Sequence, residues 1–333
     1  MNKKSGLLQA TMLTLGLFHL SHAQAQTVCA FDLGGASGDN YAFLKDYALA
    51  AKKWGVELEL KAYNSEDQAI ADFKAKKCEA LTALSFGTMQ FNQYASSMSA
   101  MGAIPTYSIA RTMLSLMGNP KVAADMVQGE YEVAGILPIG FAYFVVKDRN
   151  INTLAKAAGK RIGVLSVDPV QRRMAQKVGA IPVGMTVDNA GELFRTSKID
   201  ILPSPAIAYA PFEVYRSMGY GGGIARFPIS FLTGNLIIYK GAFPEGFGQN
   251  SRSFFASSIG RQMKLVERYE SSVPAKYWYD ISNEDTVGYL QLLRQMRIEF
   301  VKNGTYSPKM MGLMKKLRCQ QDPSSFECSL KDE

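Results

Sequence analysis

Histidine is almost absent from this chain. The 333 residues contain two histidines, His19 and His22, and no histidine follows them. Histidine is the most frequent general base and a common metal ligand, so residues 26–333 lack the side chain on which Ser-His-Asp catalysis, Cys-His catalysis and most zinc sites depend. The sequence therefore predicts no catalytic residues and no metal site, and it argues against an enzyme.

Long hydrophobic runs and blocks of like charge are also missing after residue 25. The most apolar stretch, PIGFAYFVV, has the length of a strand, whereas about 20 apolar residues are needed to cross a bilayer. The net charge of +8 is scattered along the chain, without a run of five or six like charges. These patterns predict a mature protein that neither spans a membrane nor binds nucleic acid.

The first 25 residues have the pattern of a secretory signal peptide. Lys3 and Lys4 form a basic start, an apolar stretch runs from Leu7 to Leu20, and Ala23-Gln24-Ala25 offers a small-residue cleavage site. A membrane anchor is the alternative, but polar residues interrupt the apolar stretch. We therefore expect residues 1–25 to be removed and the mature protein to be periplasmic.

All four cysteines lie in the predicted mature chain, and four cysteines allow three pairings. Cys29 and Cys78 open two strands that we expect to be parallel neighbours, and Cys319 and Cys328 enclose a short loop. We predict the disulfides Cys29–Cys78 and Cys319–Cys328, which suit an oxidising compartment. Four reduced, buried thiols are the alternative.

Two distant stretches each follow the order strand, helix, strand, helix, strand. The first begins at VCAFDLGG and ends at CEALTALS, and the second begins at RIGVLSVD and ends at IDILPS. Such a repeat predicts an α/β fold of two lobes, each built on a βαβαβ unit, that can clamp a small molecule between them. The predicted boundaries are 1–25 for the signal peptide, 26–138 for lobe I, 139–233 for lobe II, and 234–333 for a returning strand and C-terminal helices that pack across both lobes.

Candidate ligand-binding residues follow the strands, because open α/β sheets bind ligands beyond the carboxyl ends of their strands. The glycine-rich turn after the first strand lacks the spacing of a dinucleotide or phosphate loop, so we expect no nucleotide cofactor. Its amides could approach an anionic group, or the glycines could only make a tight connection. Likewise, Asp32 could bind a ligand or hold that turn, Asp168 could bind a ligand or cap a helix, and Arg172 could pair with an anion or stay solvated.

Serine and aromatic residues complete the candidate set. Each aromatic residue taken alone is more often part of a core, but together they favour a largely apolar pocket with few polar groups. Arg111 lies in a mostly apolar helix, and we expect it to form a salt bridge within the protein. The residues predicted to bind the ligand are Asp32, Gly35, Ser37, Ser85, Phe86, Phe141, Ser166, Asp168, Arg172, Ser204 and Tyr209.

Residues 153–215 resemble the TRAP-type (tripartite ATP-independent periplasmic) substrate-binding proteins. The resemblance lies in a Gly-Lys-Arg-Ile strand, a Pro-Val helix, a Lys-Val-Gly-Ala-Ile-Pro-Val link, a Glu-Leu helix and a strand that begins at Asp200 and contains a proline. It implies a two-lobe α/β periplasmic-binding-protein fold, with a hinge of connecting strands and a long helix that spans both lobes. It also implies capture of a small-molecule solute and its delivery to a membrane permease.

The chain departs from that family at two positions. Family members commonly have an arginine that clamps the carboxylate of the solute through paired hydrogen bonds, and Gly163 stands at that position here. Ser204 replaces the usual asparagine before the proline. With the aromatic residues, these departures favour a bulkier and less acidic solute.

The sequence therefore predicts a periplasmic solute-binding protein that closes on its ligand by a hinge motion. One alternative is a periplasmic accessory protein of a multidrug (RND-type) efflux system, which would share the fold and the compartment. The other is a histidine-free periplasmic enzyme that uses carboxylates, tyrosine or serine.

Overall fold

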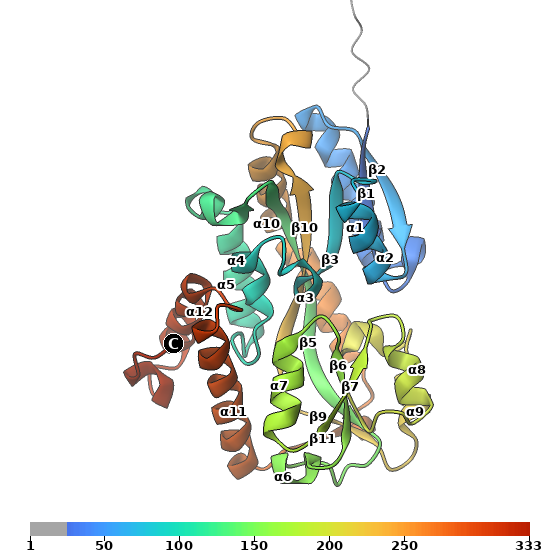
Figure 1. Cartoon of the computed structure of the whole chain (residues 1–333), viewed down its shortest axis with the longest axis vertical. Helices are drawn as coiled ribbons and strands as arrows, with labels where there is room; N and C mark the ends of the chain where they lie inside the picture. The colour runs from blue at the N-terminus through green and yellow to red at the C-terminus, as the bar shows by residue number, and fades with distance from the viewer. Residues whose placement is uncertain (1–24) are drawn as a thin grey trace, which may run out of the picture.

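A computed structural model of the protein describes residues 25–333, so the predicted signal peptide lies outside these residues except for its last position. The described chain forms two α/β lobes, one above the other in Figure 1, and a C-terminal group of helices beside them. One continuous sheet runs through both lobes in the strand order β2-β1-β3-β10-β5-β8-β6-β7. Helices cover the sheet, and two clusters of buried apolar residues lie between the helices and the sheet.

Each lobe contains one of the two predicted strand–helix–strand–helix–strand units. In each unit the middle strand of the sheet is paired in parallel with both of its neighbours, β1 with β2 and β3, and β6 with β7 and β8. The predicted fold is therefore confirmed. The lobe I unit comprises β1 (Gln26–Phe31), α1 (Asp39–Ala51), β2 (Leu58–Tyr63), α2 (Glu66–Lys74) and β3 (Ala80–Leu84). The lobe II unit comprises β6 (Arg161–Leu165), α7 (Pro169–Lys177), β7 (Ile181–Met185), α8 (Ala190–Arg195) and β8 (Ile201–Pro205).

Two long antiparallel strands connect the lobes, β5 (Tyr131–Val146) and β10 (Ser230–Tyr239). β10 pairs with β3 of lobe I, β5 pairs with β8 of lobe II, and the two pair with each other. Their register shifts between Leu232 and Thr233, opposite a segment of β5 that contains Pro138 and Gly140. Gly140 has a φ of +115°, a conformation that is accessible to glycine but costly for residues with a side chain.

Shorter elements and the C-terminal helices complete the chain. Helix α10 (Phe247–Ser271) crosses behind the sheet in Figure 1 and packs on β5, on α1 of lobe I and on residues 206–208 of lobe II. Its packing on β5 is close, because a Cβ built at Gly135 would lie 2.5 Å from the Phe255 ring. The remaining elements are α3 (Ser85–Thr88), α4 (Gln93–Ser96), α5 (Tyr107–Met117), β4 (Val127–Gln128), α6 (Leu154–Ala157), α9 (Val214–Met218), β9 (Gly223–Ala225), β11 (Trp278–Tyr279), α11 (Asn283–Lys302) and α12 (Pro308–Gln321).

Both predicted disulfides are confirmed. Cys29 is bonded to Cys78 where β1 lies beside β3, and Cys319 is bonded to Cys328 in the C-terminal segment. The predicted salt bridge of Arg111 is also present, with Glu267 of α10 as its partner.

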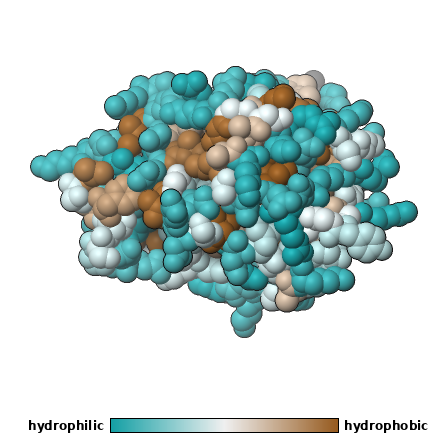
Figure 2. Space-filling view, turned by 90° about the horizontal axis from the view of Figure 1, so that it is seen from below, coloured by the Kyte–Doolittle hydropathy of each residue, from teal (hydrophilic) through white to brown (hydrophobic). Residues whose placement is uncertain are grey.

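Among residues 25–333, no helix combines the length and the apolar character that crossing a membrane requires. The face seen from below is mainly hydrophilic, with hydrophobic residues in separate areas (Figure 2).

The C-terminal segment is held by a buried network of charges. Glu327 accepts hydrogen bonds from Arg318 Nε at 2.6 Å and from Arg297 Nη2 at 3.0 Å, and Glu333 also contacts both arginines. The two guanidinium groups donate onward to the carbonyl oxygens of Met101 and Ala103. The network therefore fixes the backbone near Met101, a residue that lines the cavity described below.

We expect Glu327→Gln to lower the free energy of unfolding by about 3–5 kcal/mol, because it leaves only Glu333 to neutralise the two buried guanidinium groups. Urea denaturation followed by circular dichroism would measure the change. Asp46→Asn is the matched control, since Asp46 pairs with Arg261 at an exposed site and should contribute less than about 1 kcal/mol. Equal losses in the two variants would contradict this account of the network.

Candidate functional site

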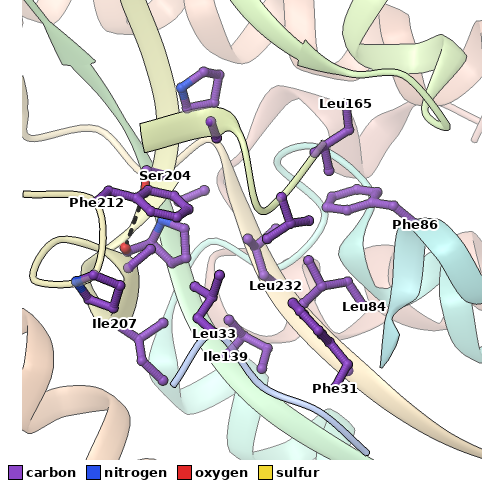
Figure 3. Close-up of a pocket in the computed structure, with 18 of the residues that line it drawn as sticks. Phe31, Leu33, Leu84, Phe86, Ile139, Leu165, Ser204, Ile207, Phe212 and Leu232 are labelled. Atoms are coloured by element: carbon purple, nitrogen blue, oxygen red, sulfur yellow. Dashed lines mark hydrogen bonds between the residues drawn. The ribbon is translucent and has the colours of Figure 1, made fainter. Parts of the chain in front are cut away.

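The carboxyl ends of the parallel strands of both lobes face one cavity of about 330 Å³ (Figure 3). The ends of β1 and β3 line it from lobe I, and β6, the end of β8 and the loop after β8 line it from lobe II. Residues of β5 and β10 near their register shift form the part of the wall that both lobes share. This is the position at which open α/β sheets bind ligands.

The wall of the cavity is largely apolar. Leu33 and Leu84 from lobe I and Ile207 and Phe212 from lobe II are only half-buried, although they are large apolar side chains. Figure 3 shows these side chains gathered around the same space. The labelled lining residues are Phe31, Leu33, Leu84, Phe86, Ile139, Leu165, Ser204, Ile207, Phe212 and Leu232.

Asp32 holds the glycine-rich turn of lobe I. Its Oδ1 accepts a hydrogen bond from the amide of Gly34 at 2.7 Å, and its Oδ2 accepts from the amides of Asn40 and Tyr41 at 3.0 and 3.1 Å. Burial raises the pKa of Asp32, although these backbone hydrogen bonds act in the opposite direction. A Cβ at Gly38 would lie 1.9 Å from Asp32 Oδ1, so the carboxylate fills the space that the glycine leaves. The amides at the start of α1 are thus already bonded to an anion of the protein itself.

Asp168 takes the corresponding place in lobe II. Its Oδ1 accepts a hydrogen bond from the amide of Val170 at 2.8 Å and caps α7. The side chain of Gln171 accepts from the amide of Leu165 at 3.0 Å and ties the end of β6 to the same helix. Burial raises the pKa of Asp168 to about 6. Of the two roles considered for Asp168, the structure shows the helix cap.

Gly163 lies in β6 against the cavity, and neighbouring side chains fill the space beside it. A Cβ at this position would lie 2.7 Å from Met185 Sδ and 2.9 Å from Ile199 Cδ1. Both neighbours are buried. A side chain added at Gly163 would therefore meet the ends of Met185 and Ile199, which would have to move.

Four of the eleven predicted ligand-binding residues line the cavity, namely Asp32, Ser37, Phe86 and Ser204. Ser204 is 1% exposed, and its hydroxyl has only a long contact of 3.4 Å with the carbonyl oxygen of Pro205. Whether these four residues contact a ligand stays a prediction.

The other seven predicted residues do not line the cavity. Ser166 and Arg172 are exposed. Ser85 is buried and hydrogen-bonded to Thr233, Phe141 packs against other aromatic rings, and the Tyr209 hydroxyl donates to the carbonyl oxygen of Ser204 at 3.4 Å. The remaining two are Gly35, buried within the turn with a φ of +55°, and the helix-capping Asp168.

Sequence reasoning missed the apolar residues that stand beside several of these predicted positions. Leu84 precedes Ser85 and Leu165 precedes Ser166, and both leucines line the cavity. Successive side chains of a strand point to opposite faces, so an error of one position at a strand end selects the wrong neighbour. The prolines at 203, 205 and 211, which also line the cavity, were a further signal.

No lysine, arginine or histidine is among the cavity-lining residues of the described chain. The acidic lining residues are Asp32 and Asp39, and Asp39 accepts a hydrogen bond from the hydroxyl of Tyr269 on α10 at 2.5 Å. Burial, with that hydrogen bond and the charge of Asp39, raises the pKa of Tyr269 to about 12. Such a site can surround a small molecule.

Comparison with known proteins shows the family of this chain. A family model described as "Solute-binding protein AdeT 1/2" matches residues 47–333. The probable solute-binding protein AdeT1 of Acinetobacter baumannii is 46% identical over 303 residues, which cover 91% of this chain and 100% of that protein. The chain belongs to the AdeT 1/2 family of solute-binding proteins. The expectation that it is not an enzyme is thereby confirmed.

The fold of this AdeT 1/2 family member is similar to that of TRAP periplasmic solute-binding proteins. One from Xanthobacter autotrophicus Py2 with bound β-D-galacturonate has a TM-score of 0.72 at 16% identity, over 88% of this chain and 99% of that chain. One from Desulfovibrio salexigens with bound orotic acid has a TM-score of 0.72 at 11% identity, over 89% of this chain and 99% of that chain. The resemblance seen in residues 153–215 is therefore confirmed at the level of the fold.

We expect Gly163→Ala to lower the free energy of unfolding by about 1–2 kcal/mol, because the added methyl group overpacks the space next to Met185 and Ile199. The loss should shrink in a Met185→Ala background, where the methyl group has room. Gly260→Ala in α10 is the control, since nothing lies within 4 Å of its Cβ position. That change should stabilise the helix by about 0.5–1 kcal/mol. An unchanged stability of Gly163→Ala in urea denaturation would contradict the packing described for this position.

A second prediction concerns Glu66 of α2. Its Oε1 accepts a hydrogen bond of 2.5 Å from the amide of Leu84, which lines the cavity. Burial raises the pKa of Glu66 from 4.5 to about 8. The folded protein thus keeps a proton that the unfolded chain releases, so this group lowers the unfolding free energy as pH rises from 4.5 to about 8. The free energy of unfolding of Glu66→Gln should therefore rise relative to that of the wild type by about 2–4 kcal/mol across that pH range.

Urea denaturation at several pH values would measure this gain, with Asp67→Asn, an exposed neighbour, as the control. A gain that stays constant with pH, or that Asp67→Asn reproduces, would contradict the assignment to Glu66.

Proposed function

We propose that this protein is an exported receptor that captures a small-molecule solute between its lobes, closes on it by a hinge motion and delivers it to a membrane permease. One observation carries the proposal. Two units from distant parts of the chain present their strand ends to the same largely apolar cavity, and neither lobe encloses that cavity alone. A change in the angle between the lobes would therefore open or close the site.

The pairing of β5 with β10 supports a hinge at the cavity. The register shift at Leu232 and Thr233 lies opposite Pro138 and Gly140, within the part of β5 that pairs with β10 and two residues before Ala142, where pairing with β8 begins. Ile139 and Leu232 line the cavity at this level. A bulged, glycine-containing segment can absorb backbone rotation that a regular ladder resists. Bending there would move the lobes and reshape the cavity together.

The periplasmic location and the permease rest on the sequence and on similarity. The predicted signal peptide and the two disulfides suit export to an oxidising compartment. The structural neighbours are periplasmic proteins of TRAP systems. The proposed partner of the closed form is therefore a membrane transporter.

The hinge motion can be measured as a distance between the lobes. Asp67 of α2 and Glu192 of α8 are exposed and belong to opposite lobes. Cysteines at both positions can carry spin labels, because the four native cysteines are bonded in pairs. Protein refolded without ligand should show a longer or broader distance distribution by pulsed electron paramagnetic resonance. Adding the small-molecule fraction of a periplasmic extract should shorten and narrow it.

Labels at Lys53 and Asp67, both exposed in lobe I, form the control pair, and their distance should not change. An interlobe distance that is the same with and without the extract would contradict the proposed function.

A further inference from the structure

The charge pattern of the cavity limits the chemistry of the solute. A carboxylate that leaves water for an apolar site needs a cation or several hydrogen-bond donors, because burying it unpaired is very costly. No cationic side chain is among the cavity-lining residues within 25–333. The one position at which the TRAP resemblance would place a clamping arginine is Gly163, and Met185 and Ile199 fill the space beside it.

Backbone amides do not replace the missing cation. A helix start can bind an anion through its free amides, and α1 and α7 both begin at the strand ends that face the cavity. However, Asp32 accepts hydrogen bonds from the amides of Asn40 and Tyr41, and Asp168 accepts from the amide of Val170. Both helix starts are therefore bonded to carboxylates of the protein. A second anion at either place would meet like charge.

The features that do face the cavity suit an uncharged molecule. Half-buried apolar side chains come from both lobes, among them Leu33, Phe86 and Phe212. A solute that covers them would remove apolar surface from water, which is favourable at about 25 cal/mol per Å².

Asp32 and Asp39 also line the wall, but their carboxylates already accept hydrogen bonds from backbone amides and from the Tyr269 hydroxyl. The other polar groups of the wall include neutral hydroxyls. Thr82 Oγ1 is buried without a hydrogen-bond partner in the described chain, and Ser204 Oγ has only its 3.4 Å contact.

We propose that the solute of this receptor is uncharged and largely apolar, in contrast to the acids bound by its structural neighbours. This inference rests on the proposed function, because it assigns a ligand class to the same interlobe cavity. A molecule of this class gains from the apolar wall, needs no counter-charge, and can use one or two hydroxyl groups of the protein for orientation.

Two fluorescent probes with the same skeleton test the charge directly. N-phenyl-1-naphthylamine is uncharged, and 8-anilino-1-naphthalenesulfonate adds a sulfonate to that skeleton. The mature protein should bind the uncharged probe at least about tenfold more tightly, since the sulfonate would be desolvated without a partner. Unlabelled 1-naphthalenemethanol should displace the probe at lower concentration than 1-naphthoate or 1-naphthylmethylamine. Absence of binding by the uncharged probe, or equal or tighter binding of either charged class, would overturn the inference.

A matched pair of leucine variants locates the binding. Leu33→Asp places a charge in the cavity wall and should lower the affinity for the uncharged probe at least about tenfold. Leu49→Asp places the same charge on the outer face of α1, where Leu49 is 65% exposed, and should leave the affinity unchanged. Circular dichroism verifies that both variants are folded. Equal affinities of wild type and a folded Leu33→Asp variant would place the probe outside the cavity and overturn the inference.

The outcomes also separate this inference from the proposed function. If the periplasmic small-molecule fraction shortens the interlobe distance but the uncharged probe does not bind, the receptor function stands and the ligand class is wrong. If neither the extract nor the probe series changes that distance, both proposals fall.

Discussion

The antiparallel pairing of β5 with β10 is the constraint on which the rest of the structure depends. Each of these strands also pairs with one lobe, β10 with β3 and β5 with β8, so a single sheet joins two units that are far apart in the sequence. Because both units meet this pair, their strand ends point into one space. The register shift near Gly140 lies at the same level, where we propose the hinge.

Within this frame, individual residues set the chemistry of the cavity. Asp32 and Asp168 accept hydrogen bonds from the backbone amides at the helix starts that face it. Met185 packs closely beside Gly163, the position at which the TRAP resemblance would place an arginine. The fold is therefore similar to that of proteins with bound acids, whereas the residues that line this cavity include no cationic side chain. A shared fold is compatible with the ligand class that we propose, because specificity resides in the site and not in the architecture.

The sequence predicted the architecture well because its signals are local and repeated. Two runs of strand and helix patterns, and four cysteines at strand and loop positions, were enough for the fold class and both disulfides. The cavity wall was harder to predict. Polar residues drew attention to Ser85 and Ser166, whereas their apolar neighbours Leu84 and Leu165 line the cavity. Which side of a strand end faces a cleft depends on twist and on the opposite lobe, and neither is encoded within a short window.

Native mass spectrometry of the protein purified from the periplasm of its own host, followed by extraction and identification of any retained small molecule, tests the central claim most directly. An uncharged, mainly apolar compound bound at one copy per chain is the predicted result. A retained sugar acid, dicarboxylate or other anion would contradict the account, because the cavity described here contains no group that could neutralise it.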